Sequence, residues 1–459
     1  MLPATYTSPQ AYFKSSLEFL SEYSWIYESA NTCFIKDGIL EIFPKEFVKY
    51  FLHINTNDLN IFPFVHHTSP AIEQESIQNF RKRLKRLIPE ESFSNPCYPD
   101  ITFAHIKTKF RKVNLKKQHE ILRLGHLITT LCDDYRIIID FGSGLGYLSE
   151  IVSVLKKDIH MLGLESDNCR VDEAKKRQLE FMFNTLDTIS YKQETITCES
   201  KNFIEMETQE IIRRNELVEP IKMAIIGLHA CGDLTITSIK LFLQMSEVKS
   251  LIIMPCCYHK MQMNTSTTFT NFPLSKTLKS EVKMNTRFSQ ILNRPFLRLA
   301  CQQTGERWRQ CTELEHSVHA IEMFERAVAE AILNPDGSEK IIKLKKKNKH
   351  NDNYKFNDFT KNFVVQLKET NKSLEWNHTH EHKFNEIIEK YPNGHKLAEG
   401  LTCLQTTLQK LCENIVLYDR LCYLEEEAAE QGLKINVRYE KIFNEKLSPR
   451  CYVLIAQKL

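Results

Sequence analysis

The sequence predicts an α/β fold, with a Rossmann-like parallel sheet covered by helices on both faces. Between residues 136 and 255, strands that are apolar throughout alternate with helical stretches, as buried parallel strands require. A glycine-rich turn over residues 140–146 joins the first of these strands to the helix that follows it. This order of elements is typical of βαβ units.

The remaining elements predict four parts along the chain. A helical N-terminal module is expected over residues 1–100, with helices at 44–52 and 70–87. The sheet core is expected over 101–300, with strands at 136–141, 160–165, 222–229 and 250–255 and helices at 118–131, 147–155, 169–183 and 237–245. A helical insertion is expected over 301–432, with helices at 318–333 and 401–430 and a mobile segment near 341–357. Residues 433–459 carry two strand patterns that predict a closing antiparallel hairpin of the core sheet.

The composition excludes several classes of protein. The chain of 459 residues has 61 Lys and Arg against 58 Asp and Glu, so its net charge of +3 excludes a globally polybasic nucleic-acid binder. No run of about 18 apolar residues predicts a membrane span, and the N-terminus does not read as a signal peptide. Its 14 cysteines form no CxxC pair, so we expect reduced thiols and a cytoplasmic or nuclear location.

The glycine-rich turn predicts a nucleotide-type cofactor. Glycines at such a turn let the backbone approach a ligand closely, and Glu165 follows Gly146 by 165 − 146 = 19 residues, where an acid reaches a ribose diol. Tyr147 stands where a dinucleotide fingerprint has its third glycine, and Asp140 places an anion near the turn. Both features favour S-adenosylmethionine over NAD. The residues expected to bind it are Asp140, Gly142, Gly144, Gly146, Glu165, Leu228 and His229.

Two further motifs, residues 228–233 and 254–259, follow later strands of the sheet and are expected to face the same crevice. Their cysteines and histidines either bind zinc or shape the pocket around the methyl donor and acceptor. Because the candidate ligands Cys231, Cys256, Cys257 and His259 are split between two loops and lack CxxC spacing, we assign no metal ligand, and zinc remains the alternative.

Methyl transfer is an in-line displacement, for which the protein supplies alignment and, for an amine or hydroxyl acceptor, a base. His229, His259 and Glu120 are the titratable candidates, and Tyr258 is the fourth residue assigned to catalysis.

The motifs at residues 117–120, 140–149, 228–232, 255–259, 271–275, 419–425 and 448–450 together resemble the methyltransferase-like protein 25 family, which includes the ribosomal RNA adenine dimethylase domain-containing proteins. The resemblance covers residues 116–300 and 417–456, and implies a class I methyltransferase fold and S-adenosylmethionine as cofactor. The motifs at 228–232 and 255–259 are also distantly similar to eukaryotic tRNA 2′-O-methyltransferases. Amino-methylating dimethylases carry an Asn/Asp-Pro-Pro-Tyr-like motif after the fourth strand, where this chain has residues 229–232 instead.

Two basic clusters point to RNA as the methyl acceptor. Residues 81–117 hold eleven basic and three acidic residues, a local charge of 11 − 3 = +8, and residues 340–349 hold six lysines. A solvated helix face or a nuclear-import signal would carry similar charge. We therefore expect an S-adenosylmethionine-dependent methyltransferase acting on tRNA or rRNA. A protein or small-molecule acceptor, or a catalytically silent binding protein on the same fold, remains the alternative.

Overall fold

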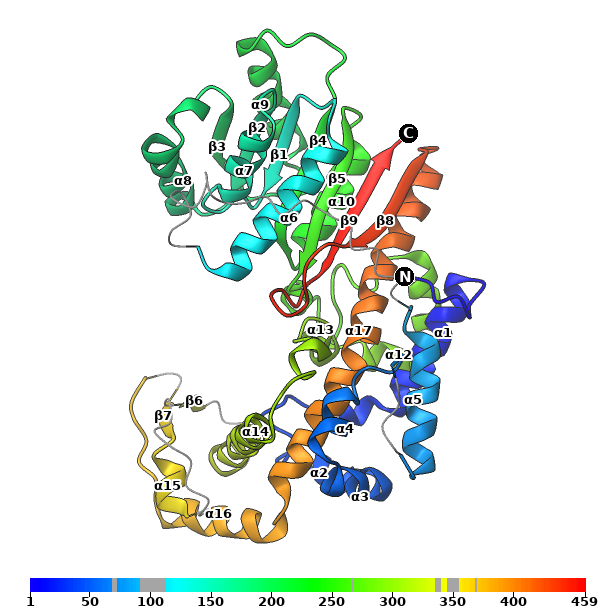
Figure 1. Ribbon diagram of the computed structural model, residues 1–459, viewed down its shortest axis with the longest axis vertical. Helices are drawn as coiled ribbons and strands as arrows, with labels where there is room; N and C mark the ends of the chain where they lie inside the picture. Colours follow the sequence, from blue (N-terminus) through cyan, green and yellow to red (C-terminus); the bar gives the residue numbers. More distant parts are fainter. Residues whose placement is uncertain (68–71, 91–112, 266, 335–339, 345–354, 368–369) are drawn as a thin grey trace.

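The computed structural model describes residues 1–67, 72–90, 113–265, 267–334, 340–344, 355–367 and 370–459. Its centre is a seven-stranded sheet in the order β3-β2-β1-β4-β5-β9-β8 (Figure 1). The first five strands are parallel, and β9 and β8 close the sheet as an antiparallel hairpin. The predicted α/β fold and closing hairpin are thus confirmed. The strands are β1 (Ile137–Phe141), β2 (His160–Glu165), β3 (Ile189–Gln193), β4 (Met223–Cys231), β5 (Val248–Cys256), β8 (Ile435–Lys441) and β9 (Tyr452–Lys458).

Helices cover both faces of this sheet because its strands are apolar on both sides. One face packs against α6 (Leu115–Leu131), α7 (Tyr147–Leu155) and α8 (Asn168–Phe181). The opposite face packs against α9 (Lys201–Arg214), α10 (Leu234–Gln244) and the end of α17. The chain order reverses between β1 and β4, and ligands of such sheets bind at this switch point, beyond the carboxyl ends of the strands.

A helical body lies beyond the carboxyl ends of the parallel strands (Figure 1). The N-terminal helices and those after β5 share one apolar cluster. Its long axis is α17 (Gly394–Glu430), whose 37 residues extend about 55 Å and continue onto the sheet. The other helices are α1 (Pro9–Glu22), α2 (Ile39–Ile42), α3 (Lys45–His53), α4 (Thr56–Ile61), α5 (Glu75–Leu87), α11 (Lys276–Met284), α12 (Thr286–Ile291), α13 (Arg294–Ala300), α14 (Glu313–Leu333), α15 (Phe356–Thr360) and α16 (His378–Lys390).

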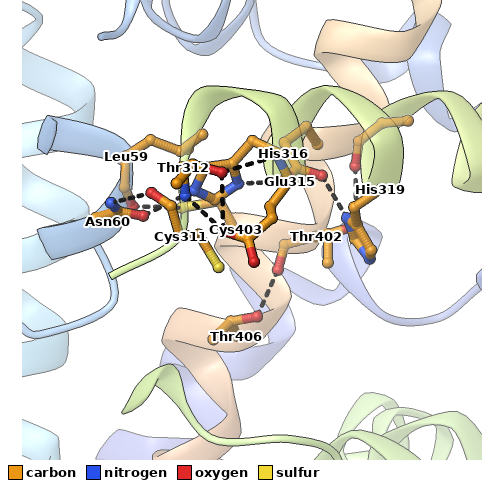
Figure 2. Close-up of polar contacts among 12 residues, drawn as sticks. Leu59, Asn60, Cys311, Thr312, Glu315, His316, His319, Thr402, Cys403 and Thr406 are labelled. Atoms are coloured by element: carbon orange, nitrogen blue, oxygen red, sulfur yellow. Dashed lines mark hydrogen bonds and ion pairs between the residues drawn. The ribbon is translucent and has the colours of Figure 1, made fainter. Parts of the chain in front are cut away.

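A buried polar network joins three helices of this body (Figure 2). Glu399 on α17 pairs with Nδ1 of both His316 and His319 on α14, each at 2.5 Å. The amide of Asn60 on α4 contacts Nε2 of His316 at 2.7 Å and donates to the carbonyl of Cys311. Burial alone would raise the pKa of Glu399, but the hydrogen bonds with His316 and His319 outweigh it and lower that pKa.

Several element boundaries differ from the sequence prediction. Strand β3 and helix α9 were not predicted from the sequence, and α5 begins at Glu75 instead of residue 70. Strands β4 and β5 run on to Cys231 and Cys256, so part of each motif expected in a loop belongs to a strand. The expected mobile segment near 341–357 overlaps α15 and the strand β6 (Lys340–Leu344), which pairs with β7 (Phe363–Leu367); residues 345–354 lie outside the described residues. The boundaries of the four predicted parts stay a prediction.

Among the described residues, no helix is both long enough and apolar enough to cross a bilayer.

Candidate functional site

The glycine-rich turn lies at the switch point, between β1 and α7. Gly142, Gly144 and Gly146 all have positive φ, at 70°, 57° and 79°, a region that favours glycine over residues with a side chain. A Cβ on Gly144 would meet nothing closer than 4.0 Å, whereas one on Gly146 would lie 2.2 Å from the hydroxyl oxygen of Tyr191. Gly144 therefore faces open space, while Gly146 is held against the sheet.

Glu165, at the end of β2, fixes the same turn. Its Oε2 accepts the amide of Gly144 at 3.0 Å, and its Oε1 accepts the amide of Asp167 at 3.2 Å. The structure thus brings the predicted acid beside the glycines, and ordinary hydrogen bonds orient it there. Turn and acid together can hold a ligand with a ribose-type diol.

Asp140, near the end of β1, contacts α7. It is fully buried, accepts the hydroxyl of Ser149 at 2.8 Å, and burial raises its pKa to about 7. The carboxyl group therefore links α7 to β1 through this hydrogen bond. Its predicted role as an anion near the ligand stays a prediction.

The second part of the site is a pair formed by His229 and Glu120. The register between β4 and β5 shifts between Gly227 and Ala230, and such bulges redirect a side chain. His229 is exposed, and its Nε2 lies 3.3 Å from Oε2 of Glu120 on α6, which is 2% exposed. Burial would raise the pKa of Glu120, but the hydrogen bonds from His229 and Ser448 outweigh it and lower that pKa. Glu120 is therefore an ionised carboxylate that orients an accessible imidazole.

The loop of the β8–β9 hairpin holds this pair in place, through contacts that no sequence pattern predicted. The hydroxyl of Ser448 donates to Glu120 at 2.6 Å across 328 residues, and the amide of Asn444 donates to Nε2 of His119 at 2.9 Å. Residues 117–120 and 448–450 were both among the motifs of the resemblance, so the structure gives them a shared role. Their pairing leaves no signal in local sequence.

The structure does not bring Tyr258 and His259 to this pair. The hydroxyl of Tyr258 donates to Glu413 of α17 at 3.1 Å, in a fully buried cluster that Arg450 completes. His259 is half-buried, with its Nδ1 3.0 Å from Sγ of Cys301 at the end of α13. The helical body covers the ring and hydroxyl of Tyr258, so this placement does not favour the predicted catalytic role, which stays a prediction.

Three cysteines of the two later motifs converge at the ends of β4 and β5. The Sγ atoms of Cys231, Cys256 and Cys257 all lie within 4.8 Å of one another, and those of Cys231 and Cys256 are 3.0 Å apart. The thiols of Cys231 and Cys256 lower the pKa of Cys257 by hydrogen bonding. All described cysteines are free thiols.

Part of the predicted basic cluster 81–117 is engaged within the protein. Arg81 is buried and donates to the carbonyls of Phe62 and Phe64, which corrects its assignment to a charged face. Arg83 pairs with Glu22 at 2.6 Å. The exposed cations of α5 are Lys82, Lys85 and Arg86. Lys107, Lys109, Arg111 and Lys112 of the first cluster lie outside the described residues, as do Lys345, Lys346, Lys347 and Lys349 of the second.

Comparison with known proteins gives the class of this domain. Residues 116–264 match the family model described as "Methyltransferase domain". The match begins on α6 and ends just after the cysteine motif, so it includes the glycine turn, Glu165 and the His229–Glu120 pair. Residues 116–264 are therefore similar to a methyltransferase domain.

Two curated relatives extend the similarity. The chain is homologous to "Probable methyltransferase-like protein 25" of Mus musculus, at 26% identity over 53% of this chain and 39% of that protein. It is also homologous to the Homo sapiens protein of the same name, at 23% identity over 75% of each chain. The chain thus spans well under half of the mouse relative. The predicted resemblance is confirmed, and the similarity to tRNA 2′-O-methyltransferases stays a prediction.

A solved structure of a plantazolicin methyltransferase in complex with SAH also matches, at 11% identity over 90% of this chain and 97% of that one. Its TM-score is 0.21, too low for an argument about this protein.

Proposed function

We propose that this protein is an S-adenosylmethionine-dependent methyltransferase and that its acceptor is RNA. One observation carries the proposal: an accessible imidazole, oriented by a buried carboxylate, lies at the end of β4, next to the strand that carries the glycine turn. The match to a methyltransferase domain over the same residues supports it.

The open side of Gly144 supports a bound nucleoside cofactor. Because glycine has no side chain there, a ligand can approach the backbone closely. Glu165 would accept hydrogen bonds from the ribose hydroxyls while it keeps the turn in place. When bound, S-adenosylmethionine supplies a methyl group on a positively charged sulfur.

His229 is the proposed base. Its Nε2 faces Glu120, which leaves the other ring nitrogen to accept the proton of an acceptor amine or hydroxyl. Protonation would create an imidazolium beside an ionised carboxylate, and that charge is stabilised there. Glu120 is a positioning residue, since it is buried and acts through His229 and Ser448.

RNA as the acceptor rests on charge. The exposed cations of α5 and the wider basic cluster of the sequence would contact phosphates without reading bases. Arg81 and Arg83 do not add to this face, because internal contacts occupy them.

Mass spectrometry of nucleosides from cells with and without the gene tests the acceptor. We expect one methylated nucleoside of tRNA or rRNA to disappear in the deletion and to return with the wild-type gene, but not with His229→Ala. Protein digests from the same cells serve as the comparison. Loss of a methylated peptide with no change in RNA would contradict the RNA proposal.

A further inference from the structure

We propose that Cys231, Cys256 and Cys257 bind one zinc ion as thiolates. The three sulfur atoms lie within 4.8 Å of one another and come from the ends of two adjacent strands. Because Zn–S bonds are about 2.3 Å long, sulfurs on one tetrahedral zinc lie about 3.8 Å apart. The set therefore has the size of a single coordination sphere. The test of this site does not depend on methyl transfer.

The backbone at the end of β5 is bent in the way that such a site needs. Successive residues of a strand point to opposite faces, so Cys256 and Cys257 would normally diverge. Cys257 instead adopts φ 48° and ψ 47°, a left-handed conformation that is rare outside glycine. This turn directs both sulfurs toward Cys231. Strain of this kind persists at sites where the surroundings fix it.

The two strand ends are held together by further contacts. Cys231 pairs with Cys256 in the sheet, and the amide of Gly232 donates to the carbonyl of Cys256 at 3.2 Å. A Cβ on Gly232 would lie 3.1 Å from the carbonyl oxygen of Lys260, so the two segments pack closely. The ligands therefore stand on ordered backbone, which lowers the entropy cost of binding an ion.

Charge and ligand number favour zinc over a monovalent ion. Three thiolates around Zn²⁺ leave a net charge of −1, and the exposed Lys260 lies three residues after Cys257. Three protein ligands leave a fourth position open, as in catalytic rather than structural zinc sites. His229 is two residues from Cys231, so a bound ion would fix the strand end that carries the proposed base.

The test is metal analysis of the full chain purified without oxygen or chelators. We expect one zinc per chain by mass spectrometry of the elements, and loss of that zinc in Cys256→Ser and Cys257→Ser. Cys198→Ser, which removes an exposed thiol elsewhere, and Cys301→Ser, next to His259, are the matched controls and should keep the zinc.

A second measurement uses the wild type alone, so that misfolding of a variant does not decide the result. Cobalt(II) added to reduced, metal-free protein should give thiolate-to-cobalt absorption at one equivalent, and a thiol-modifying mercurial should release the zinc of the native protein. Any of four results would overturn the proposal: no zinc and no cobalt absorption, copper in place of zinc, full zinc in Cys257→Ser, or a Cys231–Cys256 disulfide in the freshly purified chain.

Discussion

Replacing Gly144 by alanine separates the ligand-binding role of the glycine turn from its role in folding. The new methyl group would enter the open space above the turn, where the nearest atom, the carbonyl oxygen of Gly142, lies 4.0 Å away. The substitution creates no clash within the protein. It places a methyl group where we propose that the cofactor approaches the backbone.

Two other glycines with positive φ serve as comparisons for the stability cost of Gly144→Ala. Gly432, just after α17, has φ 67° and no atom within 4 Å of its Cβ position, so Gly432→Ala carries the same backbone cost without touching the site. That cost is roughly 1–2 kcal/mol of unfolding free energy. In Gly146→Ala the methyl group would overlap the buried ring of Tyr191, and overpacking adds about 1–3 kcal/mol.

The assay is urea unfolding of the three variants together with calorimetric titration of S-adenosylhomocysteine. Gly144→Ala and Gly432→Ala should lose similar stability, but only Gly144→Ala should lose affinity, by about tenfold or more, which is at least about 1.4 kcal/mol. Gly146→Ala should be the least stable of the three. Wild-type affinity in a folded Gly144→Ala variant would refute the placement of the cofactor at this turn.

Three further substitutions test other parts of the account. Glu165→Ala should weaken S-adenosylhomocysteine binding by about 1–3 kcal/mol, measured by calorimetry, because a charged acceptor for the ligand and for the Gly144 amide is lost. Glu120→Gln should lower kcat by about tenfold or more while the KM for S-adenosylmethionine stays constant. A raised KM at unchanged kcat would instead mean that the residue acts in ground-state binding. Glu399→Gln should cost about 3 kcal/mol at pH 7, at about 1.5 kcal/mol for each of two hydrogen bonds to a charged acceptor. Because the pKa of Glu399 is lowered from 4.5, the stability difference between the wild type and Glu399→Gln should persist above pH 4.5 and vanish as the pH falls through the lowered pKa. Thermal unfolding at a series of pH values measures this difference. A difference that does not change with pH would contradict the role of the Glu399 charge.

Sequence alone could predict the parts of the fold and site that local pattern determines. Strands β1, β2, β4 and β5 are apolar runs; the glycine turn comes at the end of β1, and Glu165 is the last residue of β2. Strand β3, at the edge of the sheet, alternates buried and more exposed residues, and its short mixed pattern escaped notice.

The missed features depend on contacts between distant segments. The carboxylate of Glu120 is fixed by Ser448, and the direction of Tyr258 is fixed by Glu413, 155 residues away. The turn at Cys257 divides the motif at 255–259. Cys256 and Cys257 lie toward Cys231, whereas Tyr258 lies toward α17. The order of residues in the motif does not predict this division. Such divisions follow from how the helical body packs beyond the sheet, which no local pattern encodes.

The most direct test of the proposed function is transfer of labelled methyl groups from S-adenosylmethionine to RNA isolated from cells that lack the gene. The wild type should label the RNA. At saturating S-adenosylmethionine, His229→Ala should transfer methyl groups about 10²–10⁴ times more slowly, because it lacks the proposed base. No label in RNA with the wild type, or equal rates for the wild type and His229→Ala, would contradict the account.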